Sequence, residues 1–185
     1  VCSSDLLTVS ARSEAALDAL VEKYKEFLPT TKETISDIAY TASIGRNHEH
    51  YRIAVLAQNI EELLRNLKAG TYVKGVANEQ LKIEFNYLES GGHVINEAKN
   101  EILSIDIGPS TNWPELLSIL SSYYSKGATI DWQTLYAPLE SNKILLPTYP
   151  FECQHIWSEL AKPQTSGILQ TSNRHPFLAQ RLNTP

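Results

Sequence analysis

The chain has no methionine and only two cysteines among its 185 residues. Cys2 and Cys153 lie near opposite ends and form no CxxC pair, so the sequence offers neither a disulfide framework nor a thiolate metal motif. A reducing, cytoplasmic setting fits this cysteine usage best. Because methionine is missing even at position 1, we expect the chain to be a segment of a longer polypeptide.

Long apolar runs and an excess of positive charge are also missing. No run approaches the ~18 apolar residues of a membrane span, and the first residues form no basic leader, so we expect no membrane partner. The 16 basic and 21 acidic residues give a net charge of -5, which leaves no positive stripe for nucleic acid. Hydrophobic residues make up 42% of the chain and charged residues 20%, a composition that predicts a folded globular domain.

The first part of the sequence alternates between strand and helix patterns. Residues 6–11 form an apolar run typical of a strand, and Ser13 is placed to cap the helix that follows. Apolar residues then recur at spacings of three and four until Pro29 stops the helix. A second helix begins near Thr34, and Gly45 is placed to end it as a left-handed C-cap.

Two further strands and a third helix follow. Residues 51–57 are apolar enough for a central strand, after which Asn59 caps a helix that Gly70 closes. Residues 81–88 alternate between large apolar and polar side chains, which predicts a third strand exposed on one side. Residues 94–103 have no clear pattern, and we read them as a short helix.

The last third combines one helix with an extended tail. Trp113 opens a helix that Gly127 ends, whereas residues 144–151 are too rich in proline for a central strand and should run extended over another surface. Residues 161–174 have linker composition. The sequence therefore predicts an α/β (α+β) fold, in which a small three-stranded sheet packs with two to three helices and is followed by a helix and an extended wrapping tail.

Candidate metal ligands do not assemble into a recognisable site. His48 and His50 are spaced i, i+2 and would need a third ligand, so a polar turn that leads into a strand explains them better. Nothing in the sequence brings a third ligand near them. The remaining candidates are His93, Cys153, His155 and His175.

Catalytic motifs are missing as well. The sequence contains no G-x-S-x-G elbow, P-loop, G-x-G-x-x-G or HExxH motif. The acidic pairs Glu61 with Glu62 and Glu97 with Glu101 lie on expected helices, where solvated faces explain them better than a general acid and base. We therefore expect no enzyme activity, no cofactor and no metal, and an independent small acyl hydrolase or transferase is the remote alternative.

Two blocks of the sequence resemble segments of modular polyketide synthases. The second block is similar to the segment that follows the acyltransferase in these enzymes. It comprises residues 127–136 and the run L-P-T-Y-P-F-E-C-Q-H-I-W over residues 146–157. The E-C-Q at positions 152–154 departs from the more usual Gln and Arg residues. The first block is similar in residues and spacing to the linker that follows ketosynthase domains; it comprises residues 6–13, 16–17, 37–41, 45–46 and 52–55.

The resemblance implies that an acyltransferase is missing between the two blocks. Only the 42 residues of 71–112 separate Gly70 from Trp113, too few for a catalytic domain. This arrangement is similar to that of trans-acyltransferase polyketide synthases, where the remaining linkers are called an acyltransferase docking domain. Residues 175–182 resemble the start of a dehydratase, and His175 should not be catalytic because that domain's catalytic histidine lies in a later motif.

The resemblance also implies the domain organisation. It predicts a ketosynthase-to-acyltransferase-type linker domain over 1–112 with a remnant segment 71–112, a post-acyltransferase-type linker over 113–160, a flexible linker over 161–174 and the start of a dehydratase over 175–185.

The function that the resemblance implies is non-catalytic. The domain would buttress the ketosynthase of the same polypeptide and dock a discrete trans-acting acyltransferase, with the acyl carrier protein as a further partner. A purely structural linker with no recruitment role is the alternative. The predicted partner contacts are Tyr149, Pro150, Phe151, Trp157, Glu97 and Glu101.

Overall fold

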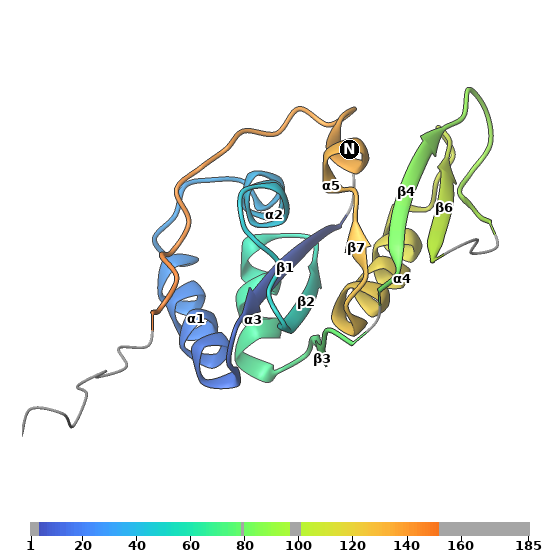
Figure 1. Ribbon diagram of the computed structural model, residues 1–185. Helices are drawn as coiled ribbons and strands as arrows, with labels where there is room; N and C mark the ends of the chain where they lie inside the picture. The colour runs from blue at the N-terminus through green and yellow to red at the C-terminus, as the bar shows by residue number, and fades with distance from the viewer. Residues whose placement is uncertain (1–3, 79, 97–100, 152–185) are drawn as a thin grey trace, which may run out of the picture. The chain divides into compact units, whose positions relative to one another are not determined.

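The computed structural model of the chain describes residues 4–78, 80–96 and 101–151. The chain divides into two units, Val1–Glu152 and Cys153–Pro185, and all described residues belong to the first unit. Helices and two small sheets alternate along this unit (Figure 1). In chain order the elements are β1 (Asp5–Ala11), α1 (Glu14–Phe27), α2 (Ile35–Ile44), β2 (Tyr51–Ala57), α3 (Ile60–Ala69), β3 (Val73–Val76), β4 (Lys82–Tyr87), β5 (Val94–Ile95), β6 (Ile102–Ile107), α4 (Trp113–Lys126), β7 (Thr129–Ile130) and α5 (Trp132–Tyr136).

Capping residues determine where the first three helices begin. Each cap side chain accepts a hydrogen bond from the backbone N–H three residues later, which satisfies one of the free donors of the first turn. The caps are Ser13, Thr34 and Asn59, as the sequence predicts. Gly70 and Gly127 end α3 and α4 in the left-handed conformation, with φ of 72° and 117°.

Gly45 ends α2 in a different way from the one expected. Its φ of -87° and ψ of 0° are right-handed, so the predicted left-handed cap is wrong. The Gly45 N–H donates to the Thr41 carbonyl at 2.8 Å, and a Cβ at Gly45 would come within 2.7 Å of that oxygen. Glycine is therefore required here because the Thr41 carbonyl leaves no room for a Cβ, and not because φ is positive.

The first sheet has the order β1-β2-β3, is antiparallel and is buried on both faces of β1 and β2. Leu7, Val9, Ile53 and Val55 point to one face, where α1, α2 and α3 pack their apolar stripes in a first core. The opposite face carries Leu6, Thr8, Ser10, Arg52 and Ala54. This confirms the three-stranded sheet with its helices, although its third strand is β3 and not residues 81–88.

Residues 81–88 do form a strand, but it belongs to a second sheet of order β5-β6-β4-β7. β4 pairs in parallel with β6 and β7, and α4 connects β6 to β7, which gives a β-α-β unit. The alternation expected from the sequence is present, because Ile83 and Phe85 are buried against α4 and α5. The inference of a helix over 94–103 is wrong, since its described residues form β5 and the start of β6.

α4 lies between the two sheets. Leu116, Leu120 and Tyr124 are buried in a second core that joins the inner face of the second sheet to Leu6 and Ala54 of the first. A Cβ at Gly75 of β3 would clash with the backbone of Ser125, so glycine at this position lets α4 approach the first sheet. The chain from α4 to α5 is thus packed against elements from both sheets.

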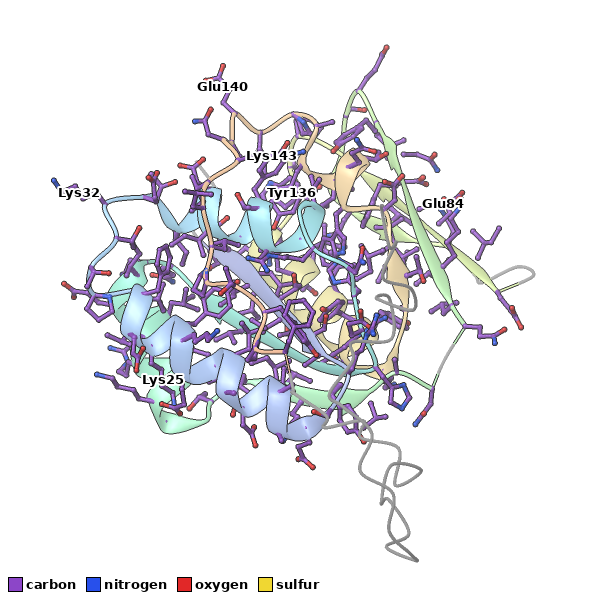
Figure 2. The ribbon with its side chains drawn as sticks, turned by 60° about the vertical axis from the view of Figure 1, so that its left-hand side comes forward. Lys25, Lys32, Glu84, Tyr136, Glu140 and Lys143 are labelled. Atoms are coloured by element: carbon purple, nitrogen blue, oxygen red, sulfur yellow. The ribbon has the colours of Figure 1, made fainter. Side chains whose placement is uncertain are left out.

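Many polar side chains lie on the outer surface of the unit (Figure 2). Lys25 on α1 and Glu84 on β4 lie on this surface (Figure 2). On the outer face of the second sheet, Asn86 Nδ2 donates to Asp106 Oδ1 at 2.9 Å. Among the described residues no helix is both long and apolar enough to cross a membrane.

Arg52 of β2 joins the first sheet to the end of α4. The residue is only 7% exposed, and Nη1 donates to the carbonyls of Tyr124 at 3.3 Å and Ala128 at 2.9 Å. Nε donates to the Glu49 carbonyl at 2.8 Å, and the guanidinium lies 4.9 Å from the centre of the Tyr124 ring. The cation therefore meets the negative end of the α4 dipole and the face of an aromatic ring.

His48 completes this joint. Its Nε2 lies 2.9 Å from the Ser43 carbonyl and its Nδ1 lies 2.9 Å from the Tyr124 hydroxyl. Because a carbonyl only accepts, Nε2 carries the proton and Nδ1 of the neutral ring accepts from Tyr124. Burial lowers the pKa of His48, the hydrogen bond to Ser43 opposes this, and the nearby Arg52 charge lowers it further.

We predict that Arg52→Ala lowers the free energy of unfolding by about 3 kcal/mol, because it removes charged hydrogen bonds and leaves the carbonyls of Tyr124 and Ala128 without them. Urea denaturation measures this change. Arg65→Ala is the control, since Arg65 is 70% exposed in its surface pair with Glu62, and it should change stability by less than about 1 kcal/mol. Equal effects of the two substitutions would contradict the role of Arg52.

We also predict that His48 makes stability depend on pH. With its pKa lowered in the fold, the unfolded chain takes up the proton first as pH falls below about 6.5, so stability present at pH 7.5 should be lost towards pH 5. The loss is at most about 1.4 kcal/mol per pH unit. Urea unfolding at several pH values should show a smaller slope in His48→Gln and an unchanged one in His50→Gln, and a His48→Gln slope equal to wild type would rule this out.

Candidate functional site

The tail after α5 is an extended segment bound to the outside of the first core. Residues 141–151 have no regular secondary structure, as expected from their prolines. Leu146 is 8% exposed and belongs to the first core, and Ile144 and Tyr149 pack against that core. The expectation that this segment runs extended over another surface is confirmed.

Side chains of α1 and α2, and of the turn after α2, hold the backbone of the tail. Arg46 Nη2 donates to the carbonyls of Leu146 at 3.2 Å and Pro147 at 2.8 Å. Lys23 Nζ donates to the Thr148 carbonyl at 3.0 Å. Further along the tail, Asn142 N–H donates to Asp37 at 2.6 Å and Ile144 N–H donates to Thr41 at 3.1 Å.

Two large apolar side chains of the tail point away from the core. Leu145 is 92% exposed and Phe151 is 84% exposed, the highest values among the exposed large hydrophobic residues that the structure describes. The Phe151 ring packs edge-on against Tyr149 with centroids 5.0 Å apart, and the Tyr149 hydroxyl accepts a hydrogen bond from Arg12 N–H at 3.1 Å. The tail thus contributes to the core on one side and presents an apolar surface on the other.

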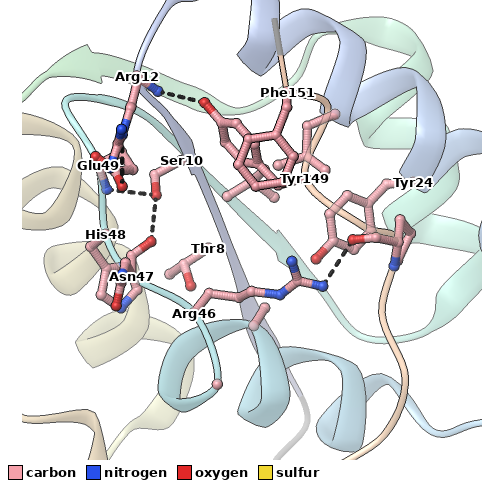
Figure 3. A pocket seen from close by; sticks show the side chains of 15 residues that line it. Thr8, Ser10, Arg12, Tyr24, Arg46, Asn47, His48, Glu49, Tyr149 and Phe151 are labelled. Carbon is pink, nitrogen blue, oxygen red and sulfur yellow. Dashed lines mark hydrogen bonds and ion pairs between the residues drawn. The ribbon is translucent and has the colours of Figure 1, made fainter. Parts of the chain in front are cut away.

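A half-open pocket of about 350 Å³ lies between β1, α1, the turn after α2 and the end of the tail (Figure 3). Tyr24 and Leu20 come from α1, and Tyr149 and Phe151 come from the tail. The remaining lining residues are Thr8, Val9, Ser10, Arg12, Ala42, Gly45, Arg46, Asn47, His48, Glu49 and Pro147.

The residues predicted as partner contacts fall into three groups. Phe151 is exposed and Tyr149 is partly buried, and Pro150 lies between them on the tail. Glu101 is exposed just before β6, with a positive φ of 64°. Glu97 and Trp157 lie outside the described residues. Of the described candidates, the structure brings Tyr149 and Phe151 into contact.

The structure shows the contacts of His48 among the candidate metal ligands and of Glu62 among the acidic residues. His48 is engaged by Ser43 and Tyr124, and the described part of the chain has no cluster of three residues that could hold a metal. Cys153, His155 and His175 lie outside that part. Glu62 lies in the first turn of α3 and accepts a hydrogen bond from Gln58 N–H at 2.9 Å, which is a helix-capping role.

Sequence reasoning missed Tyr24 and Arg46 as pocket residues. Tyr24 belongs to the apolar stripe of α1, where spacing predicts only burial, and Arg46 lies in a polar turn. No local signal shows that a tail 100 residues later closes a pocket over both side chains.

A family model described as CurL-like, PKS C-terminal, matches residues 5–67. Among curated proteins of Bacillus subtilis, polyketide synthase PksL is 29% identical over 97% of this chain and PksN is 24% identical over 94%. The chain spans only 4% and 3% of the lengths of these two relatives.

Solved structures show the same fold. The ketosynthase from module 6 of the bacillaene synthase of Bacillus subtilis aligns with a TM-score of 0.59 at 21% identity, over 83% of this chain and 27% of that one. An oxazolomycin ketosynthase domain from Streptomyces albus gives 0.56 at 18% identity, over 84% and 23%. The chain is therefore homologous to segments of polyketide synthases and has a fold that occurs within solved ketosynthase chains.

Proposed function

We propose that the chain is a non-catalytic linker domain of a trans-acyltransferase polyketide synthase, which buttresses the ketosynthase of the same polypeptide and docks a discrete acyltransferase. The observation that carries the proposal is the tail. One segment is bound to the core through its backbone and presents Leu145 and Phe151 outward, at 92% and 84% exposure. Apolar side chains held exposed on a fixed segment are typical of an interface.

The ketosynthase is the partner that the relatives support for this surface. The fold of the chain occurs in solved ketosynthase chains, of which it covers about a quarter. A segment pinned by Arg46 and Lys23 has lost its conformational freedom before it meets a partner, so binding orders few further residues. The domain would thus act as a rigid spacer that fixes the direction in which the chain leaves the ketosynthase.

A different surface is available for the acyltransferase. The second sheet includes β4, β5 and β6 of the segment 71–112. Val94 and Ile95 of its edge strand β5 and Ile102 of β6 are 51%, 39% and 39% exposed. Glu101 lies beside Ile102, and its carbonyl accepts a hydrogen bond from Lys82 N–H at 2.8 Å. This surface, which we call the β5–β6 rim, combines apolar residues with an acidic one and belongs to the second sheet. The tail's anchor residues Lys23 and Arg46 belong to α1 and to the turn after α2.

We predict that the double substitution Leu145→Ser with Phe151→Ser weakens the contact to the ketosynthase. In a polypeptide that contains both domains, the melting temperature and the condensation rate of the ketosynthase should fall, because burial of Phe151 alone contributes about 2 kcal/mol. The same double variant of the isolated chain should keep its urea midpoint, since both side chains are exposed in it.

Leu88→Ser is the matched control for this test, because Leu88 is 40% exposed and lies next to β4. It should leave the ketosynthase unchanged. If the double variant also leaves the ketosynthase unchanged, the tail does not brace it and the proposal fails.

We predict further that Glu101→Lys weakens binding of the discrete acyltransferase about fivefold, as expected for a rim charge that contributes about 1 kcal/mol, and that added salt reduces the difference. Isothermal titration calorimetry with the purified acyltransferase measures this. Glu33→Lys, an exposed site before α2, is the control and should not change affinity. Absence of any binding would favour a purely structural linker.

A further inference from the structure

Most polar groups that line the pocket described above are already hydrogen-bonded. Thr8 Oγ1 lies 3.1 Å from Ser43 Oγ. Ser10 Oγ donates to the Asn47 carbonyl at 3.2 Å and accepts from Glu49 N–H at 2.9 Å. These groups need nothing further from a ligand.

Glu49, the acidic side chain among the lining residues, is also engaged. Its Oε1 lies 3.4 Å from Arg12 Nε, so its charge is balanced within the wall of the pocket. With Glu49 and Arg12 paired, the remaining charge of the lining is the positive charge of Arg46.

Two donors in the pocket are left over. Tyr24 is only 3% exposed, and its hydroxyl makes no hydrogen bond with the described residues. This oxygen is not one of their fully buried unpartnered atoms, so it is accessible from the pocket that Tyr24 lines. Arg46 uses Nη2 for the tail, whereas its Nε and Nη1 have no partner among the described residues. Figure 3 shows the Tyr24 hydroxyl and the Arg46 guanidinium pointing towards each other inside the pocket.

The chemistry of the two groups is that of donors at neutral pH. Burial raises the pKa of Tyr24 to about 12, although the nearby Arg46 charge opposes the rise. The phenol therefore keeps its proton, and the guanidinium is always charged. Both groups donate hydrogen bonds and one of them carries a charge, so the acceptor that matches this pair best is a negatively charged oxygen.

We propose that the pocket binds a carboxylate next to a flat apolar group, with the carboxylate on Tyr24 Oη and Arg46 and the apolar group against Tyr149 and Phe151. The edge-on rings of Tyr149 and Phe151 supply the apolar wall, and a volume of about 350 Å³ suits a small organic acid. An acidic side chain beside an apolar one on an adjoining protein domain presents the same chemistry.

Phenylacetate is the probe for this site. Titrated into the ¹⁵N-labelled chain, it should shift the amide signals of the residues that line the pocket, with saturation in the millimolar range. Phenylacetamide, which has the same shape and no charge, should bind at least tenfold more weakly, because a hydrogen bond to a charged group is stronger than a neutral one.

Tyr24→Phe separates binding from folding. It removes a hydroxyl that has no partner, so the melting temperature should stay near that of wild type while phenylacetate binds about tenfold more weakly. Tyr51→Phe, outside the pocket, is the control and should bind as wild type does. Any of three results would overturn the proposal. These are equal binding of acid and amide, unchanged affinity in Tyr24→Phe, and no shifts at 50 mM phenylacetate, which is about tenfold above the expected millimolar range.

A last arm identifies the source of the carboxylate. The same titration is repeated on a polypeptide that also contains the preceding ketosynthase, an arrangement that rests on the proposed function. If the probe binds the chain alone and is excluded from the longer polypeptide, an acidic side chain of the neighbouring domain fills the pocket. If it binds both, the ligand is a free acid.

Discussion

The buried guanidinium of Arg52 is the constraint on which the arrangement of the two sheets depends. It is a cation with no carboxylate partner among the described residues, and it is compensated by carbonyl oxygens and an aromatic face. Two of these carbonyls, those of Tyr124 and Ala128, lie at the end of α4 and just beyond it. Because a buried charge tolerates no loss of its partners, α4 cannot slide along β2 without a large penalty. The second sheet packs on α4, so its position follows from the same contact.

Side-chain hydrogen bonds also fix the position of the tail on the first core. Pro147 and Pro150 remove two backbone donors, which keeps the segment out of a sheet, and the side chains of Arg46 and Lys23 supply the hydrogen bonds that strands would otherwise make. Successive side chains of an extended segment point in opposite directions, so burial of Ile144 and Leu146 requires that Leu145 face outward. Its exposure at 92% is therefore a consequence of how the tail is bound.

Local patterns were enough to predict the parts of the fold that local chemistry determines. Ser13, Thr34 and Asn59 cap helices because their side chains reach a backbone N–H three residues away, and the strand pattern of residues 51–57 reflects burial on both faces. β3 and β5 could not be predicted, because they are short and exposed and depend on pairing with distant strands. The positive φ of 64° at Glu101, just before β6, could not be predicted either, since nothing in its own side chain favours it.

The pocket shows why sites on such a domain escape sequence reasoning. Its two free donors come from an α1 residue that reads as core and a turn residue that reads as solvated, and the wall that closes it comes from Tyr149 and Phe151 more than 100 positions later. Arg46 takes part in both the attachment of the tail and the pocket, because Nη2 binds the tail while the rest of the guanidinium faces the cavity. Formation of the pocket is therefore linked to attachment of the tail. A ligand that binds Arg46 and the tail rings together stabilises the attached tail by mass action, and with it the outward position of Leu145.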